Sequence, residues 1–371
     1  MLNGKTVLVT GAPGFIGCRL VEKLMLEQNA NVRALVHKFS RAARLARLPV
    51  QMVAGRVADA EAIDKAVAGC DVVFNCAHDW MMPKENTLGT QILIDACLRH
   101  GVKRLVHLST IATYQPLPDG DLDETHPAEP DGWTYKDTKI ETERLILKAV
   151  KEKNLPATIL LPTIVYGPFA RSWVDYPVKS ILTGTVVLPD NGEGWCSAVY
   201  IDDVVDAMIL AAEREQAIGE RFLISGSEEV TWKAFFEALQ APLGVASVKY
   251  WSDEEIKQAK GDFMRNIKLM MAEPKRLVNL LPIRPLLEAV YKRMGDKAKQ
   301  QALKLWRFKR ETGIPELFLP DKEQLQLYKA RTHVSIDKAQ RLLGYKPAYS
   351  FDEGMALTQD YIRWAYPADA R

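Results

Sequence analysis

The sequence predicts an α/β protein with a doubly wound parallel sheet and a smaller, mostly helical C-terminal lobe. Short β-branched runs alternate with segments of helical periodicity through the first half of the chain, which is typical of successive βαβ units. These runs are apolar on both faces, as strands covered by helices on both sides must be. The 371 residues leave room for one large domain or two unequal ones.

The elements of the first half can be placed in order. Strands are expected at residues 5–10, 31–36, 50–54, 72–75, 104–109 and 157–161. Each is a short apolar run bounded by turn residues. Helices are expected at residues 15–28, 60–67, 84–100 and 134–152, where apolar residues recur with a helical period.

The regular alternation ends near residue 165, where prolines and glycines break the pattern into short elements. Beyond it we expect a helix over 202–213, opening on a segment in which Asp203 would cap it. A strand over 220–224 and a helix over 231–240 follow. We therefore predict one domain over residues 1–165, joined by elements that return near 199–225, and a second lobe over 166–371.

Composition excludes several classes of protein. Apolar residues make up 47% and charged residues 26% of the chain, which excludes disorder as the main state. The net charge of +2 gives no overall attraction to nucleic acid. The five cysteines form no C-x-x-C pair and no metal-spaced Cys/His cluster, so we expect reduced thiols, no metal site and a cytoplasmic protein. No run is long enough to span a membrane, and the N-terminus does not resemble a signal peptide.

A basic insert is predicted within residues 250–330. Residues 257–310 carry fifteen Lys/Arg against four Asp/Glu, and residues 283–294 show one apolar helical face. This helix either covers the core with a solvated basic back, or forms a basic surface that touches membrane lipid or an anionic substrate.

A glycine-rich turn follows the first strand, in the stretch Thr-Gly-Ala-Pro-Gly-Phe-Ile-Gly at residues 10–17. Such glycines allow a backbone to approach a pyrophosphate at a helix N-terminus. TGAPGFIG resembles the T-G-x-x-G-F-I-G signature of the extended short-chain dehydrogenase/reductases, the NAD-dependent epimerase/dehydratase family, whose sheet is of the Rossmann type. The resemblance makes residues 1–165 a dinucleotide-binding domain. It implies that the diphosphate lies on Gly11, Ala12, Gly14, Phe15, Ile16 and Gly17.

The second and third strands indicate which dinucleotide is bound. Folds that prefer NAD usually place Asp or Glu after the second strand, whereas this chain has His37, Lys38 and Arg41, with Arg44 further on. Arg56, followed by Val57, stands where the family often has an acid near the adenine. Because cations suit a 2′-phosphate, we expect NADP in preference to NAD; alternatively, these cations are a solvated helix start.

Three further stretches resemble the family's cofactor contacts. Asn75, Cys76, Ala77 and His78 resemble its N-x-A-A segment, which passes under the cofactor, with His78 a departure that serves either packing or a polar contact to substrate. Leu108, near the end of the fifth predicted strand, is also expected to contact the cofactor. The loop bordering the nicotinamide would include Pro162 and Val165.

Tyr135 and Lys139 are four residues apart on a predicted helix and so share one face. A neighbouring ammonium can stabilise a phenolate and lower its pKa, although such a pair also arises by chance. The segment beginning Ser109-Thr110 resembles the family's S-[ST]-x-x-V-Y. The resemblance implies that Thr110 holds the substrate oxygen, Tyr135 is the acid/base, and Lys139 tunes Tyr135 and binds the nicotinamide ribose. Ser109 is the alternative hydroxyl.

The sequence indicates the class of substrate through fewer residues than it does the cofactor. The arginine that often meets a nucleotide-sugar diphosphate is missing before residues 199–204, and Trp80, Met81, Trp173 and Trp195 would suit a less polar substrate or simply close the cleft. We expect an oxidoreductase of a secondary alcohol or ketone, similar to the hydroxysteroid dehydrogenase and dihydroflavonol reductase branch. The alternatives are a nucleotide-sugar epimerase or dehydratase with tightly held NAD, and a cofactor-sensing protein without turnover. The resemblance also implies a homodimer.

Overall fold

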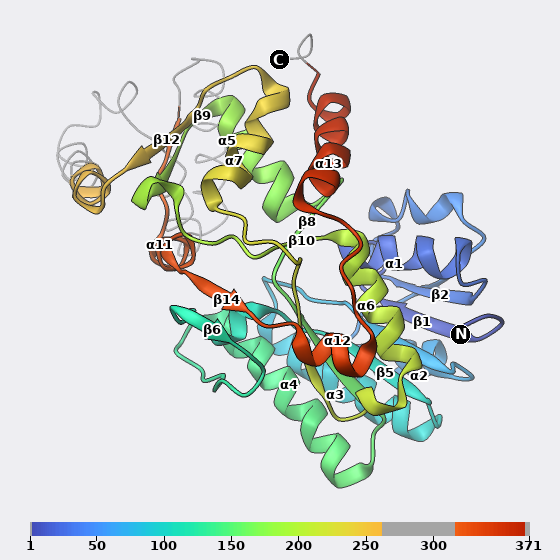
Figure 1. The fold of residues 1–371 in the computed structure, drawn as a ribbon. Coiled ribbons are helices and arrows are strands. Elements are labelled where there is room, and N and C mark those ends of the chain that lie inside the picture. Colours follow the sequence, from blue (N-terminus) through green and yellow to red (C-terminus); the bar gives the residue numbers. More distant parts are fainter. Residues whose placement is uncertain (1, 262–315, 368–371) are drawn as a thin grey trace, which may run out of the picture. The chain divides into compact units, whose positions relative to one another are not determined.

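The computed structural model describes residues 2–261 and 316–367, and its centre is a seven-stranded parallel sheet (Figure 1). The strand order is β11-β7-β5-β4-β1-β2-β3. The strands are β1 Thr6–Thr10, β2 Asn31–Val36, β3 Gln51–Ala54, β4 Val72–Asn75, β5 Arg104–Leu108, β7 Ala157–Pro162 and β11 Arg221–Ile224. The predicted doubly wound α/β class is confirmed, and each of these strands begins and ends within one residue of its predicted position.

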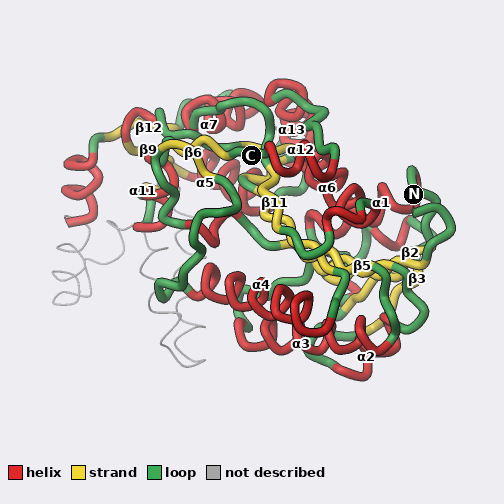
Figure 2. Tube along the Cα trace, turned by 60° about the horizontal axis from the view of Figure 1, so that its bottom comes forward, coloured by secondary structure: helices red, strands yellow, loops and turns green. Residues whose placement is uncertain are grey.

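Helices cover both faces of this sheet (Figure 2). They are α1 Phe15–Leu26, α2 Ala60–Val67, α3 Pro83–Arg99, α4 Thr134–Lys153 and α6 Ile201–Glu213. Helices α2, α3 and α4 lie on one face, and α1 and α6 lie on the other. Leu8, Val73 and Leu105 occupy one face of neighbouring strands and form a core with Leu93 and Ile146, all at most 1% exposed. The apolar faces of these helices therefore pack against the sheet, as the helical periodicity of the sequence predicts.

The strand order creates a switch point between β1 and β4. The chain moves from β1 outward to β2 and β3, then returns to β4 on the other side of β1. Ligands of open parallel sheets bind beyond the carboxyl ends of the strands at such a point. The glycine-rich turn follows β1 and the segment 76–78 follows β4, so both predicted cofactor segments lie at this place.

The described residues form two compact units that are each discontinuous in sequence. The first comprises residues 2–173, 196–230 and 330–358. Besides the large sheet it contains two short parallel ladders and helix α12. These are β8 Ile164–Tyr166 with β10 Ala198–Tyr200, β6 Gly120–Leu122 with β14 Thr332–Val334, and α12 Asp337–Leu343. The division of roles between residues 1–165 and 166–371 stays a prediction, since the compact units follow a different boundary.

The second unit comprises residues 174–195, 231–261, 316–329 and 359–367. Its elements are α5 Tyr176–Thr183, β9 Gly184–Pro189, α7 Trp232–Gln240, β12 Val248–Trp251, β13 Glu316–Phe318 and α11 Lys322–Lys329. Strand β9 pairs in parallel with both β12 and β13, and the sequence predicted none of the three. As expected, Thr231 caps α7, because its hydroxyl accepts from the Ala234 amide at 3.1 Å. Helix α13 spans Phe351–Ala365.

Two further expectations concern the cap of α6 and the presence of membrane-spanning helices. Asp203 does not cap α6, because Tyr200 is the N-cap residue and Asp203 instead accepts a hydrogen bond from the Ala348 amide at 2.6 Å. In the part of the chain that the structure describes, no helix is both long and apolar enough to cross a bilayer. Most of the basic segment 257–310, including its predicted helix, lies outside the described residues.

Candidate active site

The glycine-rich turn has a geometry that only glycine allows at two positions. Gly11 has a φ of +64°, and a Cβ there would lie 2.7 Å from the backbone of Cys76 and Ala77. A Cβ on Gly17 would lie 2.4 Å from the Gly11 carbonyl oxygen. The turn is therefore pressed against the segment after β4 and against the first turn of α1.

The N-terminus of α1 is open to an anion. Gly14 is its N-cap residue, no side chain caps it, and its first turn contains no acidic residue. Its backbone amides and the positive end of the helix dipole suit a phosphate group. The close turn and this uncapped helix fit a dinucleotide diphosphate, as the sequence predicted for Gly11, Ala12, Gly14, Phe15, Ile16 and Gly17.

The predicted catalytic side chains meet at the carboxyl end of β5. A hydrogen bond joins the Tyr135 phenol to the Thr110 hydroxyl. The Lys139 ammonium, one turn further along α4, donates to the Leu108 carbonyl at 2.8 Å. Thr110 itself starts a short turn, where its hydroxyl accepts from the Ala112 amide at 3.3 Å. This brings Thr110 and Tyr135 into contact, with Lys139 anchored beside them.

The electrostatics differ from the expectation that Lys139 lowers the pKa of Tyr135. Burial raises the pKa of Tyr135 to about 12, and the hydrogen bond with Thr110 opposes that rise. Burial also lowers the pKa of Lys139 to about 8, against the opposing effect of Glu143. Desolvation is the largest effect on the pKa of each group, although Tyr135 is half-buried and only Lys139 is buried.

Ser109 faces a different partner from Thr110. Its hydroxyl donates to the carboxylate of Glu143, and that carboxylate pairs with Arg221 at 2.8 Å. Ser109 is 4% exposed and Glu143 is 3% exposed. Of the two candidate hydroxyls, Thr110 is therefore the one that contacts Tyr135.

An aromatic cluster surrounds the Tyr135 ring. The Trp80 indole stacks on it with centroids 4.0 Å apart and planes 16° apart, and His78 and Trp133 approach it at 5.1 and 5.6 Å. Trp80 remains 63% exposed. Burial lowers the pKa of His78 to about 3, so its imidazole is neutral near pH 7. The cluster presents a largely uncharged, aromatic surface beside the phenol.

The loop that carries Trp80 is held by α3. The Asn86 side chain accepts from the Asp79 amide at 2.9 Å and donates to the Asp79 carbonyl at 2.8 Å. Asn86 is buried, whereas Met81 at the tip of the loop is 82% exposed. The loop is thus fixed at its base and exposed at its tip.

The expected cations gather near the end of β2. His37, Lys38 and Arg41 are exposed, and the pKa of His37 is lowered first by burial and then by Arg56, Lys38 and Arg41. Arg56 pairs with Glu85 at 2.6 Å. These residues form a positively charged patch, which we call the β2 patch and define as His37, Lys38, Arg41 and Arg56.

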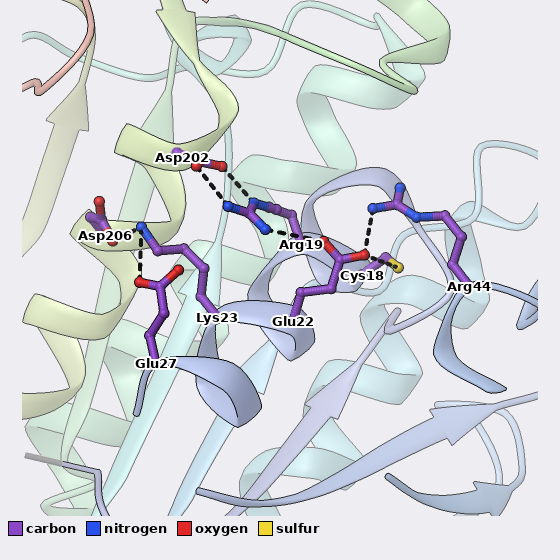
Figure 3. Close-up of polar contacts among 8 residues, drawn as sticks. All are labelled: Cys18, Arg19, Glu22, Lys23, Glu27, Arg44, Asp202 and Asp206. Atoms are coloured by element: carbon purple, nitrogen blue, oxygen red, sulfur yellow. Dashed lines mark hydrogen bonds and ion pairs between the residues drawn. The ribbon is translucent and has the colours of Figure 1, made fainter. Parts of the chain in front are cut away.

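Arg44 does not belong to the β2 patch. Figure 3 shows its guanidinium turned toward Glu22, with a contact of 2.7 Å. It also lies over the Phe169 ring at 4.2 Å from the centroid. A pocket lined by Phe15, Arg19 and these residues lies beside the start of α1.

The other predicted residues lie as follows. Val57 contacts α3, where a Cβ on Gly89 would come within 2.8 Å of it. Pro162 ends β7 and Val165 lies in β8, both buried. Trp173 ends a segment of the first unit and Trp195 belongs to the second. Their roles toward cofactor or substrate stay predictions.

Several residues near the site were missed from the sequence. Glu143 follows Lys139 by one helical turn, so the spacing from Tyr135 through Lys139 could have revealed it. Arg221, the partner of Glu143, lies on a distant strand and gives no local signal. His107 and Thr142 resemble ordinary element residues in the sequence, but both are at most 3% exposed in the structure.

Comparison with known proteins identifies the family. The family described as NAD dependent epimerase/dehydratase matches residues 7–225. The chain belongs to this family. The match covers the switch point, the glycine-rich turn and the Thr110, Tyr135 and Lys139 site.

Relatives within the family are enzymes with differing reactions. A ketoreductase of Stigmatella aurantiaca, acting on 4-hydroxy-2-methyl-3-oxo-4-farnesyl-3,4-dihydroquinoline-1-oxide, is 28% identical over 64% of this chain and 73% of its own length. A 3beta-hydroxysteroid-dehydrogenase/decarboxylase of Arabidopsis thaliana is 28% identical over 95% of this chain and 78% of its own length. The chain is therefore an NAD-dependent enzyme of the oxidoreductase or epimerase/dehydratase type.

Solved structures share the fold. A dTDP-glucose 4,6-dehydratase from Streptomyces venezuelae, crystallised with NAD, superposes with a TM-score of 0.68 at 21% identity, covering 97% of each chain. A UDP-glucuronic acid 4-epimerase from Bacillus cereus, in complex with NAD, gives a TM-score of 0.68 at 22% identity over 98% of this chain and 99% of that one. At this identity the likeness establishes the fold alone.

Proposed function

We propose that this enzyme is an NADP(H)-linked dehydrogenase/reductase that interconverts a secondary alcohol and a ketone on an apolar substrate. The observation that carries the proposal is the uncharged aromatic cluster on Tyr135, formed by His78, Trp80 and Trp133. A charged nucleotide-sugar would need polar partners, whereas this surface offers apolar contact.

The dinucleotide, when bound, donates or accepts the hydride. Gly11, Gly14 and Gly17 would hold its diphosphate, and Lys139 its nicotinamide ribose. The β2 patch supports the choice of NADP, because Lys38 and Arg41 after β2 and Arg56 after β3 complement a 2′-phosphate.

Tyr135 and Thr110 handle the substrate oxygen in this proposal. With a pKa of about 12 the Tyr135 phenol keeps its proton near neutral pH, so it suits the acid that protonates a carbonyl oxygen during reduction. The Thr110 hydroxyl, which already contacts the phenol, would hold that oxygen. In the oxidative direction the phenol must lose its proton, and Lys139 would then stabilise the phenolate.

Two relatives support the substrate class. The ketoreductase acts on a farnesyl-bearing ring, and the hydroxysteroid dehydrogenase relative matches 95% of this chain. A ring-bearing or long-chain ketone fits the aromatic cluster better than a sugar does.

The second candidate is a nucleotide-sugar dehydratase or epimerase. A dTDP-glucose 4,6-dehydratase of Streptomyces antibioticus is 31% identical over 61% of this chain and 73% of its own length. In such a reaction the hydride returns to the same substrate, so turnover needs no added cofactor.

Turnover assays separate the two candidates. We expect the purified enzyme to oxidise NADPH with a 2-alkyl-3-oxoalkanoate or a 3-ketosteroid, and to leave dTDP-glucose and UDP-glucose unchanged. Conversion of either sugar nucleotide without added cofactor, together with no NADPH oxidation by the ketones, would overturn the proposal.

Other finer expectations also stay proposals. A homodimer would have twice the 41.7 kDa chain mass in light scattering. The cytoplasmic location, and contact of residues 257–310 with a membrane surface or an anionic substrate, likewise await measurement.

A further inference from the structure

A row of buried polar side chains runs from β1 to α4. The Thr10 hydroxyl donates to Asn75 Oδ1 at 2.7 Å and accepts from the Ala77 amide at 3.3 Å. On the other side of Asn75, its Nδ2 lies 3.0 Å from Nδ1 of His107. Thr10, Asn75 and His107 are at most 4% exposed. Three neighbouring strands, β1, β4 and β5, are thereby joined through their side chains.

The row continues into the catalytic helix. The Thr142 hydroxyl lies 3.4 Å from His107 Nε2 and donates to the Lys139 carbonyl oxygen at 2.9 Å. Thr142 is 3% exposed. One end of the row is therefore the amide of Ala77, beside the glycine-rich turn, and the other is the main chain of Lys139.

The hydrogen atoms along this row have one consistent direction. The Thr10 hydroxyl donates its proton to Asn75, so the side-chain atom of Asn75 that faces Thr10 is the acceptor Oδ1. The Asn75 amide nitrogen therefore faces His107 and donates to Nδ1. His107 must then carry its proton on Nε2. Because the Thr142 proton is used on the Lys139 carbonyl, the Thr142 oxygen is free to accept from Nε2. Each donor meets an acceptor, and no buried polar atom in the row lacks a partner.

His107 also has no role as a cation. Burial lowers its pKa well below the usual value, and Lys139 and His78 lower it further. A neutral imidazole has one donor and one acceptor on opposite sides, which is what the row requires.

We propose that His107, as the neutral Nε2–H tautomer, is a positioning residue that holds helix α4 in register with the ends of β1 and β4. Its effect reaches Lys139 through Thr142, while the Lys139 ammonium is held by Leu108, the residue after His107. The row therefore fixes Lys139 relative to Ala77 and the glycine-rich turn. The inference rests on the proposed role of Lys139 in dinucleotide binding.

The first test reads the tautomer directly in the full-length protein. We expect ¹⁵N NMR of the His107 ring, assigned through its correlations to the backbone, to show a protonated Nε2 and an unprotonated Nδ1. The pattern should not change between about pH 5.5 and pH 8.5, because the pKa of His107 lies well below the ordinary value of about 6.5. A protonated Nδ1, or titration within this range, would overturn the proposal.

The second test breaks the row and restores it. Thr142→Val keeps the shape of the side chain but removes the acceptor for His107, whereas Thr142→Ser keeps the hydroxyl. We expect NADPH, titrated by its fluorescence, to bind Thr142→Val up to about tenfold more weakly, the upper range for the loss of one neutral hydrogen bond. Thr142→Ser should bind like the wild type.

A purely structural role predicts a different result. In that case Thr142→Val would melt at a lower temperature but bind NADPH normally, and the proposal would be wrong. If Thr142→Val does not fold, the tautomer measurement on the wild-type protein still decides. Full turnover by the Tyr135→Phe enzyme would instead overturn the proposed function. That result would not bear on the His107 tautomer, so the two proposals can fail separately.

Discussion

Two polar networks flank the central sheet, and they use opposite kinds of groups. Between α1 and α6 the pairs Arg19–Asp202 and Lys23–Asp206 are charged, and their side chains are 9–41% exposed (Figure 3). Beneath α4 the row from Thr10 to Thr142 is uncharged and at most 4% exposed. Burying a charged side chain costs much hydration free energy, which favours partly exposed positions for these ion pairs. Neutral polar side chains can be buried at lower cost when their hydrogen-bonding groups have partners, as in this row.

The difference bears on what each network does. Ion pairs between partly exposed side chains hold α1 and α6 together, and solvent screening weakens the contribution of each pair. The row beneath α4 depends on the angle of every hydrogen bond, so it defines one position of the catalytic helix.

The largest effect is expected at the end of α4 that faces substrate. Tyr135→Phe removes the acid/base hydroxyl and should lower kcat by roughly 10² to 10⁴, with dinucleotide affinity almost unchanged. Steady-state kinetics with the active ketone measures this. Lys23→Met, on the charged side of the sheet, is the control and should keep kcat. Near-normal turnover of Tyr135→Phe would remove Tyr135 from the mechanism.

The next effect tests the buried row as a source of stability. Asn75→Leu has a similar shape but leaves Thr10 and His107 without partners inside the core, and should reduce the free energy of unfolding by about 3 kcal/mol. Urea denaturation followed by circular dichroism measures it. Lys65→Ala breaks only an exposed pair with Glu61 and should cost about 0.5 kcal/mol or less. Equal losses would mean that the buried row contributes no more to stability than one exposed ion pair.

A smaller effect concerns the β2 patch, whose charged side chains contrast with the neutral side chains of the buried row. Arg41→Ala should weaken NADPH binding about tenfold and NADH binding much less, because only NADPH carries the 2′-phosphate. Isothermal titration with both dinucleotides measures the ratio. Arg47→Ala, on the same connection between β2 and β3, is the control. An equal loss for NADPH and NADH would refute the charge argument.

The smallest effect concerns the buried carboxyl of Asp203. Asp203 is 1% exposed, its Oδ2 has no hydrogen-bond partner among the described residues, and burial raises its pKa to about 6. Between its unfolded value near 3.9 and about 6 the folded state binds more protons, so its contribution to stability is lost as pH rises through that window. Asp203→Asn should therefore stabilise the protein by on the order of 1 kcal/mol at pH 7.5 and not at pH 4. Thermal melts at both pH values measure this, and an equal change at both would contradict it.

The sheet and the glycine-rich turn could be predicted because their causes are local. Buried parallel strands are continuous apolar runs, and a turn that must pass within van der Waals distance of Cys76 needs glycine at position 11. The second unit was harder, because β9 lies between Gly184 and Pro189 in a stretch where prolines and glycines interrupt the alternation of strands and helices. Its partner strands β12 and β13 also lie far along the chain, so their pairing gives no local signal.

The site was predicted as a set of residues but not in its electrostatics. Tyr135 and Lys139 were found by helical spacing, yet desolvation by the surrounding fold moves both pKa values more than their mutual interaction does. Arg44 was grouped with the cations of the β2 patch, although the fold turns it to Glu22. Asp203 has the sequence context of a cap but sits one turn too far into α6. Each case depends on neighbours that are distant in sequence.

The stacked pair of Trp80 and Tyr135 gives the enzyme an intrinsic optical reporter. An indole that is 63% exposed and lies 4.0 Å from the Tyr135 ring would lose water contact if a substrate ring bound against it, and we expect its emission then to shift to shorter wavelength. Trp80→Phe would silence this change while the other seven of the eight tryptophans continue to emit. Candidate ketones can therefore be ranked by emission spectrum before any turnover is detected.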